Sequence, residues 1–207
     1  EVSEELEKLP NANYAEVVEE GVTDATRKKI TRQILIGNGT TNNIVGIFSD
    51  KATAIDPATD LEISEITADT LDEIIYSYGG DEDVEDIAVL VLNKADLKAF
   101  AMLRHDDGRK VFEVKNNGNT GTIDTVPYII NSACSSIVDG EVDSYCMAYG
   151  PLSNYTLATF SPLDVKRSDD YRFKQGMIAH RGSVFTGGNV TSYNGFLRVK
   201  KGAGTGE

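Results

Sequence analysis

The final third of the chain most constrains the fold, because it reads as extended segments that carry many charges and several glycines. Two long segments within residues 173–201 are separated at Gly187-Gly188, and their large apolar residues stand apart from one another. Neither segment holds a paired nucleophile and base, a cluster of metal ligands or a phosphate-binding loop. Exposed strands of this kind favour pairing with other copies of the chain over enclosing a small substrate.

The net charge argues against a nucleic-acid-binding surface. The 207 residues include 33 acidic and 20 basic side chains, which gives a formal net charge of −13. A protein that binds the phosphate backbone needs clustered lysine and arginine to neutralise it. No apolar stretch approaches the ~20 residues that span a bilayer, and residues 1–9 lack the features of a signal peptide. We therefore predict neither specific nucleic-acid binding nor a membrane partner.

Hydrophobic periodicity predicts a long helix near the start of the chain. Residues 14–36 have a stripe of side chains at every fourth position. Its members are Tyr14, Val18, Val22, Thr26, Ile30 and Ile34. Asn13 is a candidate N-terminal cap, Gly37 a candidate end, and Gly21 a candidate bend inside the helix.

The middle of the chain predicts a separate α+β unit. Residues 71–78 have the spacing of an amphipathic helix, and residues 87–92 form an apolar run of the length of a buried strand. Asn93 is placed to cap a further helix. We expect strands at residues 110–114 and 122–131 after it. A final sheet is expected to contain residues 155–160, 163–167, 176–185 and 189–199.

Several stretches, in chain order, are similar to the major capsid protein family of tailed double-stranded DNA bacteriophages and prophages, which has the HK-97 fold. They resemble its glycine turn after a helix, its strand–helix–turn, a strand start, the entry into its final sheet and its C-terminal strands. The matching residues are Ile36–Gly39 with Gly46-Ile47, Leu92–Leu103 with Asp106–Arg109, Val126–Tyr128, Ala148–Ser153 and Phe173–Lys201. The resemblance covers the C-terminal two thirds of the family's fold.

This resemblance implies an α+β fold in which an axial domain is inserted in a discontinuous peripheral domain. Residues 1–55 and 155–201 would form the peripheral domain, residues 56–154 the axial domain and residues 202–207 a flexible tail. The N-terminal arm and the extended loop of the family are missing from this sequence. Because arm and loop supply much of the contact between subunits in the family, the shortened chain is compatible with a monomer in solution.

The same resemblance implies a structural function. The chain is expected to be a major capsid protein that assembles into hexamers and pentamers of an icosahedral shell around double-stranded DNA. Copies of itself are then its main partners, and portal, scaffold, maturation protease and decoration proteins are further ones. We expect assembly in the bacterial host cytoplasm, a final location in the virion, no cofactor, no metal and no catalytic residue.

Charged residues are the candidates for contacts between subunits. Those on the expected final sheet are Arg167, Asp169, Asp170, Arg172, Arg181, Lys200 and Lys201. Around the capsomer axis the candidates are Asp81, Asp83 and Asp107. Some members of the family cross-link subunits through a lysine and an asparagine, with a glutamate nearby. The resemblance aligns those asparagine and glutamate positions with Gly176 and Ser183, so we predict no such cross-link.

Two other functions remain open at this stage. The first is an encapsulin-type nanocompartment shell, which shares the fold. The second is an unrelated α+β hydrolase, which would have to recruit His105 or His180, and neither lies in a recognised nucleophile motif. Cys134 and Cys146 do not form a C-x-x-C pair, and we expect both to be buried or half-buried thiols. The acidic run 81–86 lacks the pattern of an EF-hand and is expected to be a solvated loop.

Overall fold

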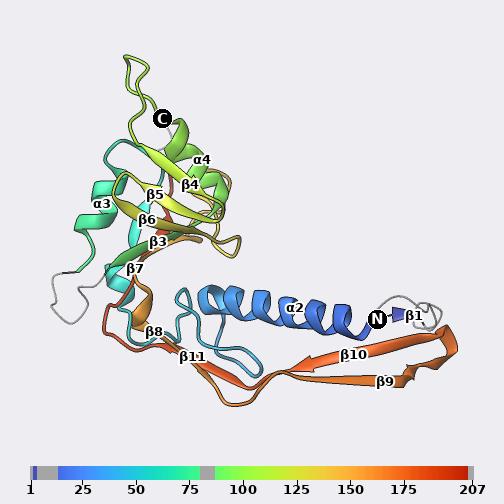
Figure 1. Ribbon diagram of the computed structural model, residues 1–207. Helices are drawn as coiled ribbons and strands as arrows, with labels where there is room; N and C mark the ends of the chain where they lie inside the picture. The colour runs from blue at the N-terminus through green and yellow to red at the C-terminus, as the bar shows by residue number, and fades with distance from the viewer. Residues whose placement is uncertain (1, 4–13, 80–86, 205–207) are drawn as a thin grey trace. The chain divides into compact units, whose positions relative to one another are not determined.

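The computed structural model describes residues 2–3, 14–79 and 87–204 (Figure 1). They belong to two compact units. Unit 1 combines residues 1–31 with residues 157–187, and unit 2 combines residues 32–156 with residues 188–207. Within the described residues, no helix has both the length and the apolar character needed to cross a membrane.

Unit 1 contains most of helix α2 and a three-stranded antiparallel sheet with the strand order β1-β10-β9. The elements are α2 (Tyr14–Ile36), β1 (Val2–Ser3), β9 (Asp164–Arg172) and β10 (Met177–Ser183). Strands β9 and β10 form a long two-stranded ribbon that turns at residues 173–176. A Cβ at Gly182 of β10 would clash with the Val22 side chain of α2, so glycine here allows helix and ribbon to approach closely.

The stripe predicted for the long helix is confirmed. Where α2 lies in unit 1, Val18, Val22, Thr26 and Ile30 are half-buried while their neighbours on the helix are exposed. Helix α2 continues without a break through Gly21, so the candidate bend is not formed. The candidate cap Asn13 lies outside the described residues.

The C-terminal end of α2 lies in unit 2 and is closed by the chain that follows it. The backbone N–H groups of Ile47 and Phe48 donate to the carbonyls of Ile34 and Leu35, both at 2.8 Å. These bonds satisfy carbonyls that a helix end otherwise leaves without partners. A Cβ at Gly46 would clash with the backbone of Leu35 and its neighbours, so the crossing requires glycine. Gly46 lies in one of the stretches on which the family resemblance rests.

Unit 2 is built on a seven-stranded mixed sheet with the strand order β2-β12-β7-β3-β6-β5-β4. Its strands are β2 (Leu61–Ile63), β3 (Ala88–Leu92), β4 (Val114–Asn117), β5 (Thr120–Ile123), β6 (Val126–Ile130), β7 (Tyr145–Pro151) and β12 (Leu197–Lys201). Helices α3 (Thr70–Tyr76) and α4 (Lys94–Met102) cover one face and share a core with it. Residues 35–55 contribute half of the buried residues in the core on the other face.

The single final sheet expected from the sequence is wrong. Strand β10 pairs with β1 on one side and β9 on the other, strands β8 (Tyr155–Thr159) and β11 (Thr186–Val190) form a two-stranded sheet, and β12 enters the large sheet between β2 and β7. The reason lies in residues 196–199, which are all buried. A strand without an exposed face needs cover on both sides, which the large sheet provides and a ribbon does not.

Of the predictions for residues 93–131, one is confirmed and two are wrong. Asn93 caps α4, since its Oδ1 accepts from the N–H of Ala95 at 3.0 Å. The strand expected at 110–114 begins only at Val114. The strand expected over 122–131 is a hairpin of β5 and β6, because Asp124 takes a positive φ of 51° and reverses the chain.

The two compact units are bounded differently from the expected peripheral and axial domains. The expected boundaries fall after residues 55 and 154, whereas the units divide after residues 31, 156 and 187. The peripheral and axial assignment describes position in a shell, which a single chain does not test. It therefore stays a prediction.

Candidate assembly surfaces

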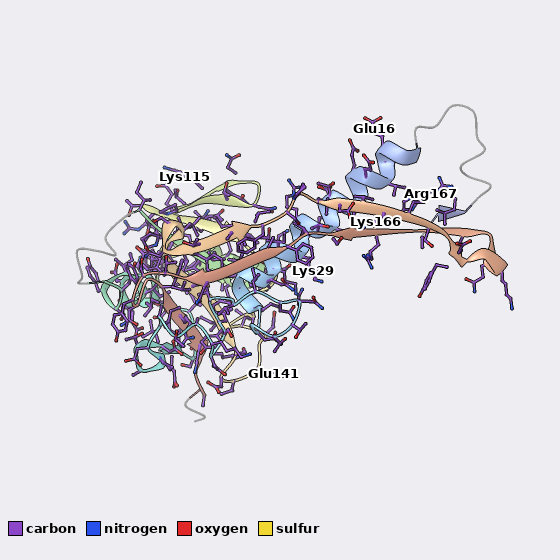
Figure 2. All side chains as sticks on the ribbon, turned by 90° about the horizontal axis from the view of Figure 1, so that it is seen from below. Glu16, Lys29, Lys115, Glu141, Lys166 and Arg167 are labelled. Carbon is purple, nitrogen blue, oxygen red and sulfur yellow. The ribbon has the colours of Figure 1, made fainter. Side chains whose placement is uncertain are left out.

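The β9–β10 ribbon brings together half of the ten charged residues that the sequence analysis proposed for subunit contacts. These are Arg167, Asp169, Asp170 and Arg172 on β9, and Arg181 on β10. Their register places Arg181 opposite Lys166 and His180 opposite Arg167. Figure 2 shows Lys166 and Arg167 on the ribbon. The sequence nominated these residues one by one, and the antiparallel register collects them on one sheet.

The ribbon places two exposed cations opposite each other. Lys166 and Arg181 are both exposed, and like charges at directly paired positions repel. Lys166 also forms an ion pair with Asp164, with Nζ and Oδ2 3.2 Å apart. Lys166 thus has a carboxylate partner on its own strand and a second cation across the ribbon.

Unit 1 also exposes an aromatic pair that sequence reasoning missed. Phe160 and Phe185 are 76% and 71% exposed, and the N–H of Phe160 donates to the carbonyl of Phe185 at 2.8 Å. Exposed aromatic side chains are enriched at protein interfaces. The only sequence signal was large apolar residues in an otherwise polar stretch.

Lys200 and Lys201, the remaining nominated residues of the last strand, lie in unit 2 and contact their own chain. The Nζ atom of Lys200 lies 3.4 Å from Oδ2 of Asp60 and 3.4 Å from Oδ1 of Asp143. The Nζ atom of Lys201 donates to the carbonyl of Gly140 at 2.8 Å. Both lysines therefore hold strand β12 to neighbouring loops, and a role between subunits stays a prediction.

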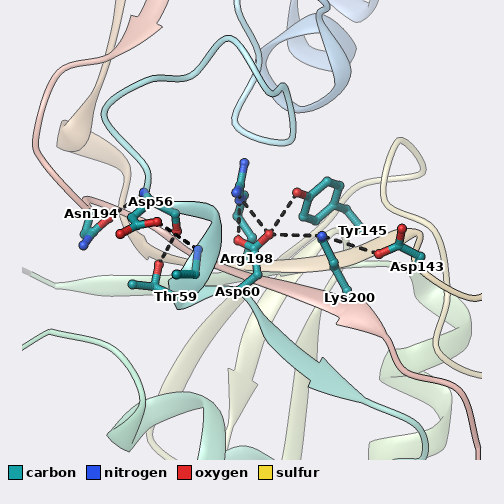
Figure 3. A network of polar contacts seen from close by, with 9 residues as sticks. Asp56, Thr59, Asp60, Asp143, Tyr145, Asn194, Arg198 and Lys200 are labelled. Carbon is teal, nitrogen blue, oxygen red and sulfur yellow. Dashed lines mark hydrogen bonds and ion pairs between the residues drawn. The ribbon is translucent and has the colours of Figure 1, made fainter.

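Asp60 is the centre of a buried charge network (Figure 3). Arg198 donates to both of its oxygens, at 2.7 and 3.0 Å, and the two side chains are 1% and 4% exposed. Tyr145 donates its hydroxyl to Asp60 at 2.9 Å, and the guanidinium lies 4.9 Å from the Tyr145 ring centre. Every charge here is balanced, so the network fixes the strand and offers no group for chemistry.

A tight hairpin follows α4 and carries the nominated residue Asp107. Its carboxylate accepts from the backbone N–H of Arg109 at 2.9 Å and from Nε of the same residue at 2.7 Å. These two hydrogen bonds lower the pKa of Asp107. Both side chains are exposed, so the pair orders the hairpin tip. The other axial candidates, Asp81 and Asp83, lie outside the described residues.

The histidines and cysteines are the residues that a hydrolase site would have to recruit. His105 belongs to unit 2 and His180 to unit 1. No group of three or more potential metal ligands occurs in the described part of the chain. Cys134 and Cys146 are buried free thiols, as expected, and burial raises the pKa of Cys134 to about 12.

Comparison with known proteins gives this fold and these surfaces a context. The model of the phage capsid family matches residues 1–201. The chain belongs to the phage capsid family. A search of curated proteins gave no match.

Solved structures of capsid shells share the fold at low sequence identity. The capsid of an empty GTA particle is 18% identical with a TM-score of 0.71, and the match covers 97% of this chain and 70% of that one. Gordonia phage Cozz is 15% identical with a TM-score of 0.65, over 98% and 68% of the two chains. The holo-SrpI encapsulin complex of Synechococcus elongatus PCC 7942 is 12% identical with a TM-score of 0.62, over 99% and 72%.

The chain thus has the HK-97-like α+β fold and is a structural major capsid protein of the phage type. Its place is the icosahedral shell of a virion, and its main partners are copies of itself.

Proposed function

We propose that this phage capsid protein forms the hexamers and pentamers of a shell that encloses double-stranded DNA, and that it does so without catalysing a reaction. The single observation that carries the proposal is the match of the family model to residues 1–201, nearly the whole chain. Assembly takes place in the bacterial host cytoplasm. Portal, scaffold, maturation protease and decoration proteins are the further partners we propose.

The chemistry of the described residues supports a structural function. Burial raises the pKa values of Cys134 and Cys146, which favours the neutral thiols over the nucleophilic thiolates. The net charge of −13 also suits a container for nucleic acid, because an acidic protein repels packaged DNA and lets it slide.

The charged ribbon and the hairpin tip are the surfaces we propose for contacts between copies. Arg167, Asp169, Asp170, Arg172 and Arg181 would act on the ribbon and Asp107 on the hairpin. Asp81 and Asp83, which lie outside the described residues, stay candidates for contacts around the capsomer axis. Lys200 and Lys201 would contribute from β12 beyond their internal contacts. Interfaces of standard size bury about 800 Å² on each partner, which a single residue cannot supply.

Expression of the chain followed by electron microscopy tests this function. We expect closed shells, or flat rings of five and six copies, when the protein is concentrated. Nuclease-protected double-stranded DNA inside particles purified from a phage-producing host would complete the test. A protein that stays monomeric at every concentration and in the presence of its scaffold and portal partners would refute the proposal.

An encapsulin-type shell is a second candidate, favoured by the structural match to the encapsulin complex at a TM-score of 0.62. The contents of purified particles separate the two functions. Packaged DNA supports the phage head, whereas a protein cargo without nucleic acid supports the nanocompartment.

A further inference from the structure

Unit 2 separates its charges along the chain. Residues 52–93 contain many aspartate and glutamate residues and not one lysine, arginine or histidine. The next stretch, residues 94–115, contains most of the lysine and arginine of unit 2. Its basic residues are Lys94, Lys98, Arg104, Arg109, Lys110 and Lys115, and all are exposed. Helix α3 lies in the acidic stretch and helix α4 in the basic one.

The outer face of α3 is acidic and ends in an aromatic ring. Asp69, Asp72, Glu73 and Tyr76 are spaced as neighbours on one side of a helix, and all are exposed, Tyr76 at 83%. The opposite side, which includes Ile74, is buried in the core of unit 2. The core therefore fixes which side of α3 points to solvent.

The outer face of α4 is basic and ends in a methionine. Lys94, Lys98 and Met102 follow one another at intervals of four residues and are exposed, Met102 at 62%. Leu97 and Phe100 anchor the other side in the same core. Among the residues that the structure describes, Asp69, Asp72, Glu73, Lys94 and Lys98 take part in no ion pair.

The two outer faces match in order and spacing. On α3, carboxylates on two successive helical turns precede Tyr76. On α4, lysines on two successive turns precede Met102. In both helices successive positions are one helical turn of about 5.4 Å apart. Side by side in the same direction, each ammonium would meet a carboxylate and the tyrosine would meet the methionine sulfur, a favourable contact. Within one copy the faces do not meet, because both helices are fixed on the core and lie apart in Figure 1.

We propose that the outer face of α3 in one copy docks on the outer face of α4 in the next copy. This inference rests on the proposed function and names one of its contacts. The two faces differ, so the contact is heterologous and leads from copy to copy around a ring. Opposite charges at such a contact select the correct neighbour and register more than they add affinity.

Charge reversal on each face tests the contact. The first variant carries Asp72→Lys and Glu73→Lys, and the second carries Lys94→Glu and Lys98→Glu. A third chain carries all four changes and keeps the net charge of −13 of the parent chain. Circular dichroism and thermal melting establish that each variant is folded. Sedimentation velocity over a concentration series then measures association of each variant alone and of an equal mixture of the first two.

We expect each single-face variant to self-associate at least about tenfold more weakly than the parent chain, because two attractive pairs become repulsive. The four-fold variant should recover, since its charges are exchanged but still complementary. The mixture should also recover, because each variant retains the face that the other needs. Both mixed chains remain acidic overall, so net charge cannot bring them together.

A matched control uses Glu19→Lys and Glu20→Lys, an adjacent pair of exposed carboxylates on α2. This variant should not rescue the α4 variant in a mixture. Undiminished association of either single-face variant, failure of the mixture to recover, or equal rescue by the α2 control would each overturn the docking proposal. Association of the parent chain into shells or rings would still uphold the proposed function, whereas a parent chain that never associates defeats both.

Discussion

Arg198 shows how a single residue ties distant parts of unit 2 together. Among the described residues, Arg198 has the largest of the fully buried side chains. It follows the apolar residues Phe196 and Leu197 in the sequence. A buried guanidinium requires a carboxylate that accepts its hydrogen bonds, and Asp60 provides one from the start of the sheet. The pair thus joins β12, late in the chain, to the segment before β2.

Asp60→Ala should lower the free energy of unfolding by about 3–5 kcal/mol, because it leaves the Arg198 charge buried without its partner. Urea unfolding followed by circular dichroism measures the loss. The double variant Asp60→Leu with Arg198→Met removes both charges and should cost clearly less. An equal or greater loss in the double variant would show that packing rather than charge compensation governs the site.

A second buried carboxylate gives the protein a pH dependence. Asp96 is fully buried in α4, where its Oδ1 accepts from the Ser136 hydroxyl at 2.7 Å and from the N–H of Ile137 at 2.9 Å. Burial raises the pKa of Asp96, and the hydrogen bonds oppose the shift only in part. The folded state therefore holds this proton more tightly than the unfolded state does.

The sign of the resulting effect follows from proton linkage. The stability that protonated Asp96 contributes is complete below its unfolded pKa of about 4 and is lost as the pH rises through the raised folded pKa. Asp96→Asn stays neutral, so its unfolding free energy relative to the parent chain should increase from about pH 4 upward and then level off. Urea unfolding across pH tests this, with exposed Asp106→Asn as the control. A difference that does not change with pH would contradict the prediction.

At the scale of elements, the crossing after α2 depends on the absence of a side chain. Gly46 lies against the backbone of Leu35, so Gly46→Ala should lower the free energy of unfolding by about 1–3 kcal/mol through overpacking. Gly21 lies within α2 itself, and a Cβ added there would meet open space. Gly21→Ala should instead stabilise the protein by about 0.5–1 kcal/mol through helix propensity. Thermal unfolding of the two variants should shift in opposite directions, and a shared direction would argue against the steric explanation.

Elements set by local rules could be predicted from the sequence. The α2 stripe and the Asn93 cap depend on residues within a few positions of one another, and both are confirmed. The single final sheet was wrong because β12 pairs with β2, more than a hundred positions earlier. Local pattern does not specify such a partner. The charged residue inside the apolar run at 196–199 did signal a buried counterion, but nothing in the run identified Asp60.

The candidate surfaces also combine features that the local sequence shows with features that depend on the fold. Charged residues of β9 and β10 could be nominated from composition, but their opposition across the ribbon depends on register. The amphipathic spacing of residues 71–78 predicted a buried side for α3, but the charged outer faces of α3 and α4 were missed because their match depends on both helices packing on one core. The absence of basic residues between positions 52 and 93 was the available signal.

For the whole molecule, the family resemblance assigns Gly176 and Ser183 to the positions of the cross-linking asparagine and glutamate. Neither residue can form or promote an isopeptide bond, so assembled particles should dissolve in hot detergent to a single band near 22.5 kDa. Denaturing gel electrophoresis of purified shells measures this. A ladder of higher bands that resists reducing agent would contradict it.

The backbone passes between the two units at residues 31, 156 and 187, so three peptide links connect them. A single protease cut at any one of these points leaves the other two intact. A nicked copy would consequently keep its two units covalently joined. A shell made of many copies could therefore accumulate such cuts without losing either unit of a subunit.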